Sequence, residues 1–244
     1  MKYIVFVMLL TLLMDTFSCA QKPPVLKLVT EDYPPLTYAV GDSVMGFGAE
    51  VVKAIQAEVK SSDKIKIMDW STAYNTALNE PNVIIFTMEK TPERDTSFYW
   101  VGPLGKNKTY LYAKADTTLV IRSLEEAKFL KTIATTTDWF SEKYLQKNGF
   151  TNLISNYKPT DAVKLIMSGD ADAAVFTDLT VNQIVRQAGY EPGALVPVFE
   201  LLDTDFYIGI SKLTDKKIVD KWTKAFEKIK QEGTLTRLQN KFLR

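Results

Sequence analysis

Short apolar runs alternate with helix-like segments along most of this chain, and this order restricts the fold more than any other feature of the sequence. Runs typical of β-strands stand at residues 26–30, 65–68, 83–86, 109–113, 132–135, 173–176 and 206–211. In the segments between them, apolar residues recur at intervals of three and four, as at Val52, Ile55 and Val59, which indicates amphipathic helices. We expect helices at residues 49–60, 71–80 with Ser71 as the N-cap, 139–148, 160–168, 179–188 and 216–232. Strands that alternate with helices favour an α/β fold.

Composition excludes several classes of protein and of site. The 244 residues suggest one or two domains, and the 46% hydrophobic fraction is that of an ordinary globular protein. The net charge of +1 argues against nucleic-acid binding, which usually needs a basic excess. The chain has no histidine and one cysteine, Cys19, so it has no catalytic triad based on histidine and no internal disulfide. We predict no metal and no cofactor.

The first twenty residues are typical of an export signal. Lys2 precedes an apolar run of eleven residues, Ile4–Met14, which is too short to span a bilayer but has the length of a signal-peptide core. Ser18 and Ala20 then place small side chains where a signal peptidase reads them, so we predict cleavage after Ala20 and a periplasmic protein. A buried helix and a lipoprotein acylated at Cys19 are the alternatives, although Thr16 and Phe17 make a poor acylation motif.

Two segments that directly follow predicted strands suit a small ligand. Residues 33–38 (YPPLTY) hold two prolines, which stiffen the loop, and Tyr33, which can stack on a ligand. Residues 87–94 (TMEKTPER) offer Thr91 as the cap of a helix that begins at Pro92, with Arg94 one turn in. The planar guanidinium of Arg94 suits a carboxylate, and ligands of open α/β sheets lie beyond the carboxyl ends of the strands. The alternatives are a proline-rich turn with a surface tyrosine and a solvated helix start.

A third segment, residues 172–180, is another predicted strand that runs into a helix. Thr177 and Asp178 stand at that junction, where the alternative to ligand binding is an N-cap. The chain carries no GxSxG, P-loop or GxGxxG motif, so the residues themselves point to no enzyme class.

The order of these segments closely resembles the family 3 extracellular solute-binding proteins of bacterial polar amino-acid uptake systems. The resemblance covers about residues 25–244. It rests on the segments LKLVTEDYPPLTY, GFGAEVVKAI, NVIIFTMEKTPERD, MSGDADAAVFTD, FYIGISK and EKIKQEGTLTRLQNKF.

This resemblance implies a two-lobe periplasmic-binding-protein fold of type II, with a ligand cleft that closes by hinge bending. Lobe 1 takes residues 22–107 and 204–244, and lobe 2 takes residues 108–203. The resemblance also implies how the residues act: Arg94 binds the ligand carboxylate, and Thr87, Glu89 and Tyr33 line the cleft beside it. Further contacts are implied at Thr137 and Asp138, with tryptophans near the cleft at Trp70 and Trp139.

Three positions depart from the pattern of the family. Gly48 stands where an acidic residue is usual, and Glu89 stands where serine or threonine is usual. The aspartate that holds the ligand's α-ammonium group falls on Thr177 by direct count, with Asp178 one residue further on. An amine-bearing ligand would need Asp178 or Glu89 as its counter-ion. The alternative is a carboxylate without an amine, with Thr177 as a neutral donor and Glu89 tied to Lys90 or Arg94.

Three functions therefore remain open. The leading prediction is a periplasmic protein, monomeric, that captures an amino acid or a similar small polar carboxylate for an ABC permease. The second is an enzyme on the same scaffold, similar to the cyclohexadienyl dehydratases, in which Glu89 acts as an acid. The third is a sensor that presents its closed form to a membrane receptor.

Overall fold

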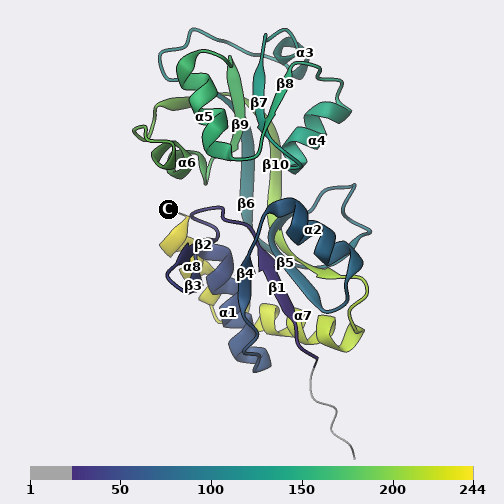
Figure 1. Ribbon diagram of the computed structural model, residues 1–244. Helices are drawn as coiled ribbons and strands as arrows, with labels where there is room; N and C mark the ends of the chain where they lie inside the picture. Colours follow the sequence, from purple (N-terminus) through teal and green to yellow (C-terminus); the bar gives the residue numbers. More distant parts are fainter. Residues whose placement is uncertain (1–23, 244) are drawn as a thin grey trace, which may run out of the picture.

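The computed structural model describes residues 24–243, which form two α/β lobes stacked end to end (Figure 1). One mixed sheet of eight strands runs through both lobes in the order β4-β1-β5-β10-β6-β9-β7-β8. Its two central strands, β6 (Phe98–Lys114) and β10 (Leu195–Ser211), are antiparallel partners that pass from one lobe into the other. The predicted leader lies outside the described residues. None of the helices within residues 24–243 is long and apolar enough to cross a membrane.

Lobe 1 is built on three parallel strands. They are β1 (Lys27–Thr30), β4 (Ile65–Ile67) and β5 (Val83–Glu89). Around them lie α1 (Phe47–Val59), α2 (Trp70–Asn79), α7 (Lys216–Gln231), α8 (Thr234–Phe242) and a hairpin of β2 (Tyr38–Val40) and β3 (Ser43–Met45). Every residue of β5 is buried, because helices cover the sheet on both faces.

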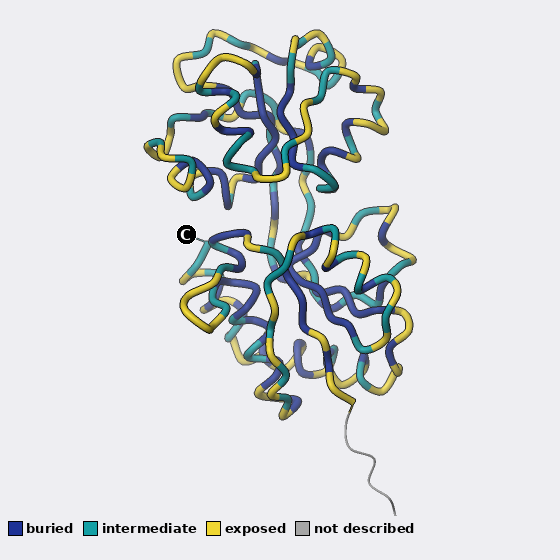
Figure 2. The backbone as a smooth tube through the Cα atoms, viewed as in Figure 1, coloured by how far each residue is buried: buried dark blue, intermediate teal, exposed yellow. Residues whose placement is uncertain are grey.

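Lobe 2 repeats this plan on a smaller scale. Its parallel strands are β7 (Ile133–Thr136), β8 (Leu153–Asn156) and β9 (Ala173–Thr177). Its helices are α3 (Leu124–Ala127), α4 (Phe140–Lys147), α5 (Pro159–Ser168) and α6 (Val181–Gln187). Most buried residues lie on the strands inside each lobe, and the exposed segments lie mainly on the outside (Figure 2).

The crossing strands are much longer than the sequence predicts. Only residues 109–113 and 206–211 carry an apolar strand pattern, yet each strand has 17 residues. The polar stretch Lys106–Lys108 pairs with Asp203–Asp205 between the lobes, and Lys106 forms ion pairs with Asp203 and Asp205. Cross-strand charge pairing therefore extends both strands where intrinsic strand propensity is low.

Two predicted helix starts are wrong. The segment after β5 makes turns instead of a helix at Pro92: Arg94 N donates to Thr91 O, and Ser97 N donates to Arg94 O. Because β6 begins at Phe98, too few residues remain to form a stable helix. Helix α2 is capped by Asp69, which accepts from Thr72 N at 2.9 Å, and not by Ser71.

Candidate ligand-binding site

The two lobes meet along a cleft at the carboxyl ends of their parallel strands. Lobe 1 presents the loop after β1 and the turn after β5, and lobe 2 presents the end of β9 and the start of α4. The cleft encloses a cavity of about 20 Å³. Six of the predicted site residues line this cavity: Tyr33, Trp70, Thr87, Glu89, Arg94 and Thr177.

Side chains from both lobes close the cavity. The Tyr33 ring meets the Trp139 ring edge to face, with centroids 4.9 Å apart. The Tyr33 hydroxyl lies 3.1 Å from the hydroxyls of Thr177 and Thr180, and Trp139 Nε1 donates to the Glu31 carboxylate at 3.2 Å. A cavity of this size has room for about one water molecule. A ligand as large as an amino acid therefore requires the lobes to separate.

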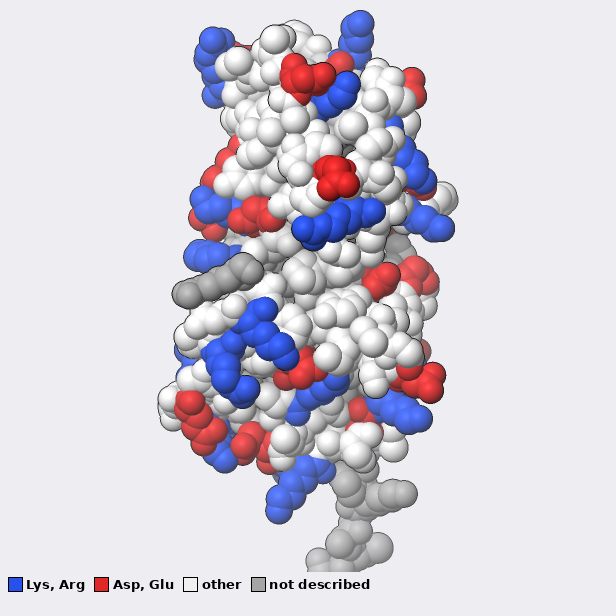
Figure 3. Space-filling view, turned by 90° about the vertical axis from the view of Figure 1, so that its left-hand side faces the viewer, with Lys and Arg blue, Asp and Glu red and all other residues white. Residues whose placement is uncertain are grey.

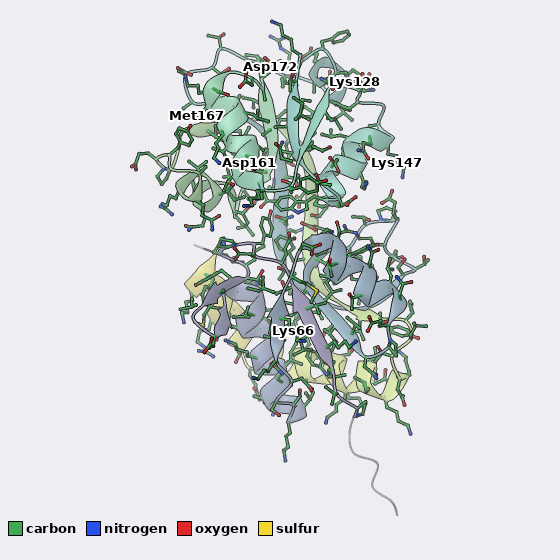
Figure 4. The ribbon with its side chains drawn as sticks, in the orientation of Figure 1. Lys66, Lys128, Lys147, Asp161, Met167 and Asp172 are labelled. Atoms are coloured by element: carbon green, nitrogen blue, oxygen red, sulfur yellow. The ribbon has the colours of Figure 1, made fainter. Side chains whose placement is uncertain are left out.

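A larger groove of about 830 Å³ opens beside the closed cavity. Trp70, Arg94 and Phe140 line both spaces, so the groove continues the cleft outward. Aromatic and charged side chains form its walls: Tyr74, Tyr144, Lys90, Lys143, Lys147, Glu93 and Asp138. Lys147, labelled on α4 in Figure 4, forms an ion pair with Glu93 across the two lobes.

Arg94 lies where the small cavity meets the groove, and only 7% of its surface is exposed. Its guanidinium carbon is 5.2 Å from the Trp70 ring, 5.1 Å from the Tyr74 ring and 5.9 Å from the Phe140 ring. Its polar contacts are long: Nη1 donates to the Glu89 carbonyl at 3.4 Å and lies 3.7 Å from the Glu89 carboxylate. The aromatic rings thus hold the guanidinium in place while much of its hydrogen-bonding capacity stays unused.

Two carboxyl groups share the cavity with Arg94. Glu89 is buried and accepts from Asn107 Nδ2 at 2.9 Å. Burial raises the pKa of Glu89 to about 7, although the Arg94 charge opposes the shift. Burial and the neighbouring Glu89 charge raise the pKa of Glu31 to about 8, against the Trp139 hydrogen bond and Arg94. Near neutral pH the empty cavity therefore favours protonation of at least one carboxyl group.

Three other predicted residues lie outside the cavity. Thr137 is tied to β8, because both its hydroxyl and its N–H donate to the Asn156 carbonyl. Asp178 is exposed and accepts from Lys108 N at 3.3 Å. Asp138 lies at the rim of the groove, where it accepts from Ser71 at 2.8 Å and pairs with Lys143 at 2.9 Å.

Thr177 and Asp178 are neighbours in the sequence but lie in different surroundings. Thr177 ends β9, pairs with Thr109 of β6 and faces the cleft. The next residue, Asp178, points away from it. Of these two neighbouring residues, Thr177 lines the cavity and Asp178 does not.

Several residues that line or support the site were missed, among them Glu31, Asn107, Thr109 and Phe140. Glu31 had a signal, since it directly follows the predicted strand at residues 26–30. Asn107 and Thr109 lie on the part of the sheet that crosses between the lobes, where the sequence carried no ligand-binding pattern.

Gly48 on α1 explains one departure from the family pattern. A Cβ atom at this position would lie 2.4 Å from Cγ2 of Thr87, a cavity residue. The absence of a side chain at Gly48 thus allows α1 to pack directly against the wall of the cleft.

The chain has the two-lobe fold of the periplasmic binding proteins. A histidine kinase sensor domain with similarity to periplasmic binding proteins matches with a TM-score of 0.80 and 18% identity, over 90% of this chain and 96% of that domain. An ancestral arginine-binding protein bound to arginine matches with a TM-score of 0.76 and 20% identity, over 90% of this chain and 98% of the other.

The sequence comparison gives the family. The chain belongs to the bacterial extracellular solute-binding proteins, family 3, whose sequence profile matches residues 26–244. It is 25% identical to the arginine-binding extracellular protein ArtP of Bacillus subtilis (strain 168), over 86% of this chain and 82% of that protein. It is 24% identical to the L-cystine-binding protein TcyJ of the same organism, over 87% and 81% of the two chains. The fold class and the family predicted from the sequence are confirmed.

Proposed function

We propose that this protein captures an amino acid, or a similar small polar carboxylate, in the periplasm and delivers it to an ABC importer. The observation that carries the proposal is Arg94, whose buried guanidinium is held among aromatic rings and has its nearest carboxylate contact at 3.7 Å. The contact of Arg94 with Glu89 is long, so a ligand carboxylate that accepts two parallel N–H bonds from the guanidinium would stabilise the closed cleft.

The relatives support an amino acid as the ligand class. ArtP binds arginine and TcyJ binds L-cystine, as their names state. In our proposal the carboxylate of the ligand lies on Arg94, with Trp70 beside it and Thr87 and Tyr33 donating neutral hydrogen bonds. The rest of the ligand extends toward the groove lined by Tyr74 and Phe140.

Capture requires a hinge. We propose that residues 22–107 with 204–244, and residues 108–203, move as two bodies about the crossing strands. Solution scattering should show a smaller radius of gyration when a saturating amino acid is added, together with a change in the emission of Trp70 and Trp139. An unchanged radius at saturation would contradict the hinge.

Export completes the proposal. The leader at residues 1–20 would direct the chain to the periplasm, where a monomer cut after Ala20 would meet an inner-membrane permease. Sequencing of the mature N-terminus tests this step, and a chain that starts at Met1 or at an acylated Cys19 would contradict it.

A melting-temperature screen tests the ligand. The twenty amino acids and their 2-oxo acids should be compared, since a ligand at 100 times its Kd adds about 2.7 kcal/mol of stability. Arg94→Ala is the matched control and should lose the shift. The proposal fails if no carboxylate raises the melting temperature of the wild-type protein.

Two observations keep other functions in view. The fold is shared with a histidine kinase sensor domain, which favours a sensor as the second candidate. The raised pKa of Glu89, about 7, suits an acid catalyst. Permease genes beside this gene would favour transport over sensing, and mass spectrometry of the bound ligand after long incubation would reveal turnover.

A further inference from the structure

The charges around the small cavity do not balance. Glu31, Glu89 and Arg94 all line it, so two carboxylates face one guanidinium when all three groups are ionised. The cavity walls contributed by lobe 2 are uncharged: Thr109, Trp139, Phe140, Ser141, Val175, Phe176 and Thr177. A cationic group is therefore the charge that this cavity lacks.

Two buried oxygen atoms at or beside the cavity have no hydrogen-bond partner among the described residues. Thr109 Oγ1, on β6, is buried and has no hydrogen-bond partner among residues 24–243, and the same holds for Asn107 Oδ1. Thr109 lines the cavity, and the amide of Asn107 already donates to Glu89. Buried polar atoms without partners are rare, so these two oxygens mark a place where a donor is expected.

We propose that the ammonium group of the ligand lies between Glu31 and Glu89, where it displaces a proton that the two carboxyl groups hold when the cleft is empty. This inference rests on the proposed function, in which Arg94 takes the carboxylate of the same ligand. The displaced proton passes to solvent. The ligand ammonium group and Arg94 then face the ligand carboxylate and the two glutamate carboxylates, so the closed cavity carries one net negative charge. The counter-ion of the amine thus comes from lobe 1, since Thr177 occupies the matching position in lobe 2.

The direction of the pH dependence follows from the groups that face the pair. Burial raises the pKa of both carboxyl groups, to about 8 for Glu31 and about 7 for Glu89. The charge of Asp32 raises the pKa of Glu31 further, and the charge of Arg94 lowers the pKa of both carboxyl groups. Burial raises the pKa of Tyr33, so its hydroxyl stays neutral. A cation binds best to the ionised pair, so affinity should rise with pH between 5.5 and 7.5. Each proton released contributes roughly a tenfold change in affinity per pH unit below the pKa.

Calorimetry with L-arginine and L-glutamine measures the proton directly. The heat of binding should differ between phosphate and Tris buffers at pH 6.5 by an amount that corresponds to about one released proton. The matching 2-oxo acids, which lack the amine, should bind more weakly and release no proton. Tight amino-acid binding with no proton release would overturn this inference and leave the proposed function standing.

Variants assign the proton to its residues. Glu31→Gln and Glu89→Gln should each weaken amino-acid binding by roughly tenfold or more and reduce the pH slope, whereas Asp178→Asn, outside the cavity, should leave both unchanged. Unchanged affinity and pH slope in both glutamine variants would contradict the inference.

Carbon NMR of the glutamate carboxyl groups gives a readout that needs no ligand. In the empty wild-type protein, at least one of Glu31 and Glu89 should titrate near pH 7. Titration of both below pH 5.5 would overturn the shared proton even if amino acids bind. A different result would contradict the proposed function alone: at least one glutamate titrates near pH 7, but no amino acid raises the melting temperature.

Discussion

The two faces of the cleft differ in charge. Lobe 1 brings Glu31, Glu89 and Arg94 to the small cavity, while the lobe 2 side is aromatic and hydroxylic. Lobe 2 does hold charged residues near the cleft, but Asp138, Lys143 and Lys147 lie along the outer groove, and Asp178 lies outside both spaces. We infer that lobe 1 recognises the charged groups of the ligand and that lobe 2 covers them, excludes water and fixes the closed position.

One outer face of the molecule shows no such division. On the face drawn in Figure 3, positive and negative side chains are interspersed over both lobes. The division of charge is therefore a local property of the cleft. This division depends on which strand ends reach the cavity, and variants in either lobe can test it.

The largest effect is expected at Arg94, the one cation of the lobe 1 wall of the cavity within residues 24–243. Arg94→Ala would leave the ligand carboxylate and Glu89 unpaired, at a cost of roughly 3–5 kcal/mol, so affinity should fall on the order of a hundredfold or more. Arg94→Lys should also bind poorly because the planar fork is lost.

Titration calorimetry measures both variants, and Lys164→Ala serves as a control because its ammonium pairs with Asp161 on α5 and lines neither the cavity nor the groove. Near-normal binding by Arg94→Ala would remove the basis for assigning recognition to lobe 1.

The next effect is expected where α1 packs behind the lobe 1 wall. Gly48→Ala places a methyl group 2.4 Å from Cγ2 of Thr87, so Thr87 must move. Overpacking of this kind costs about 1–3 kcal/mol, and both the melting temperature and the affinity should fall. Gly105→Ala is a matched control, because its Cβ would make only an ordinary contact at 3.5 Å. Equal melting temperatures for the two variants would show that Thr87 moves aside without a cost in stability.

A smaller effect is expected on the lobe 2 side. Thr177→Val removes the hydroxyl that lies 3.1 Å from the Tyr33 hydroxyl, while Thr180 remains as a partner for Tyr33. Loss of one neutral hydrogen bond costs about 1 kcal/mol, so affinity should fall roughly fivefold. A loss as large as that of Arg94→Ala would mean that lobe 2 takes part in recognition as strongly as lobe 1.

The sequence predicted those parts of the site that depend on strand ends. Arg94, Glu89 and Tyr33 follow apolar runs directly, and in an α/β sheet such positions converge on one edge. Asn107 and Thr109 could not be found in this way. Thr109 reaches the cavity and Asn107 reaches Glu89 because β6 pairs with β10 and β9, and that pairing depends on partners far away in the sequence.

The fold shows the same limit. The parallel strands and most helices were predicted from local periodicity, because each buries its own apolar face. The crossing segments 98–108 and 195–205 were missed, since polar residues such as Lys106 and Asp205 form strands there only through mutual pairing. Glu31 is a different case: its place after β1 was visible, but its role depends on the distant Arg94 and Glu89.

The smallest effect is expected at Asp178, the other residue considered as a counter-ion for an ammonium group. Its carboxylate is exposed and accepts from Lys108 N at 3.3 Å, and it lines neither the cavity nor the groove. A swing into the cavity would require β9 to shift by one residue, which would turn its buried face toward solvent. Asp178→Ala should therefore change the affinity for L-arginine or L-glutamine less than twofold, whereas Glu89→Gln should change it far more. If the order of these two variants is reversed, the negative charge that holds the ligand belongs to lobe 2, and the comparison of the two cleft faces must be inverted.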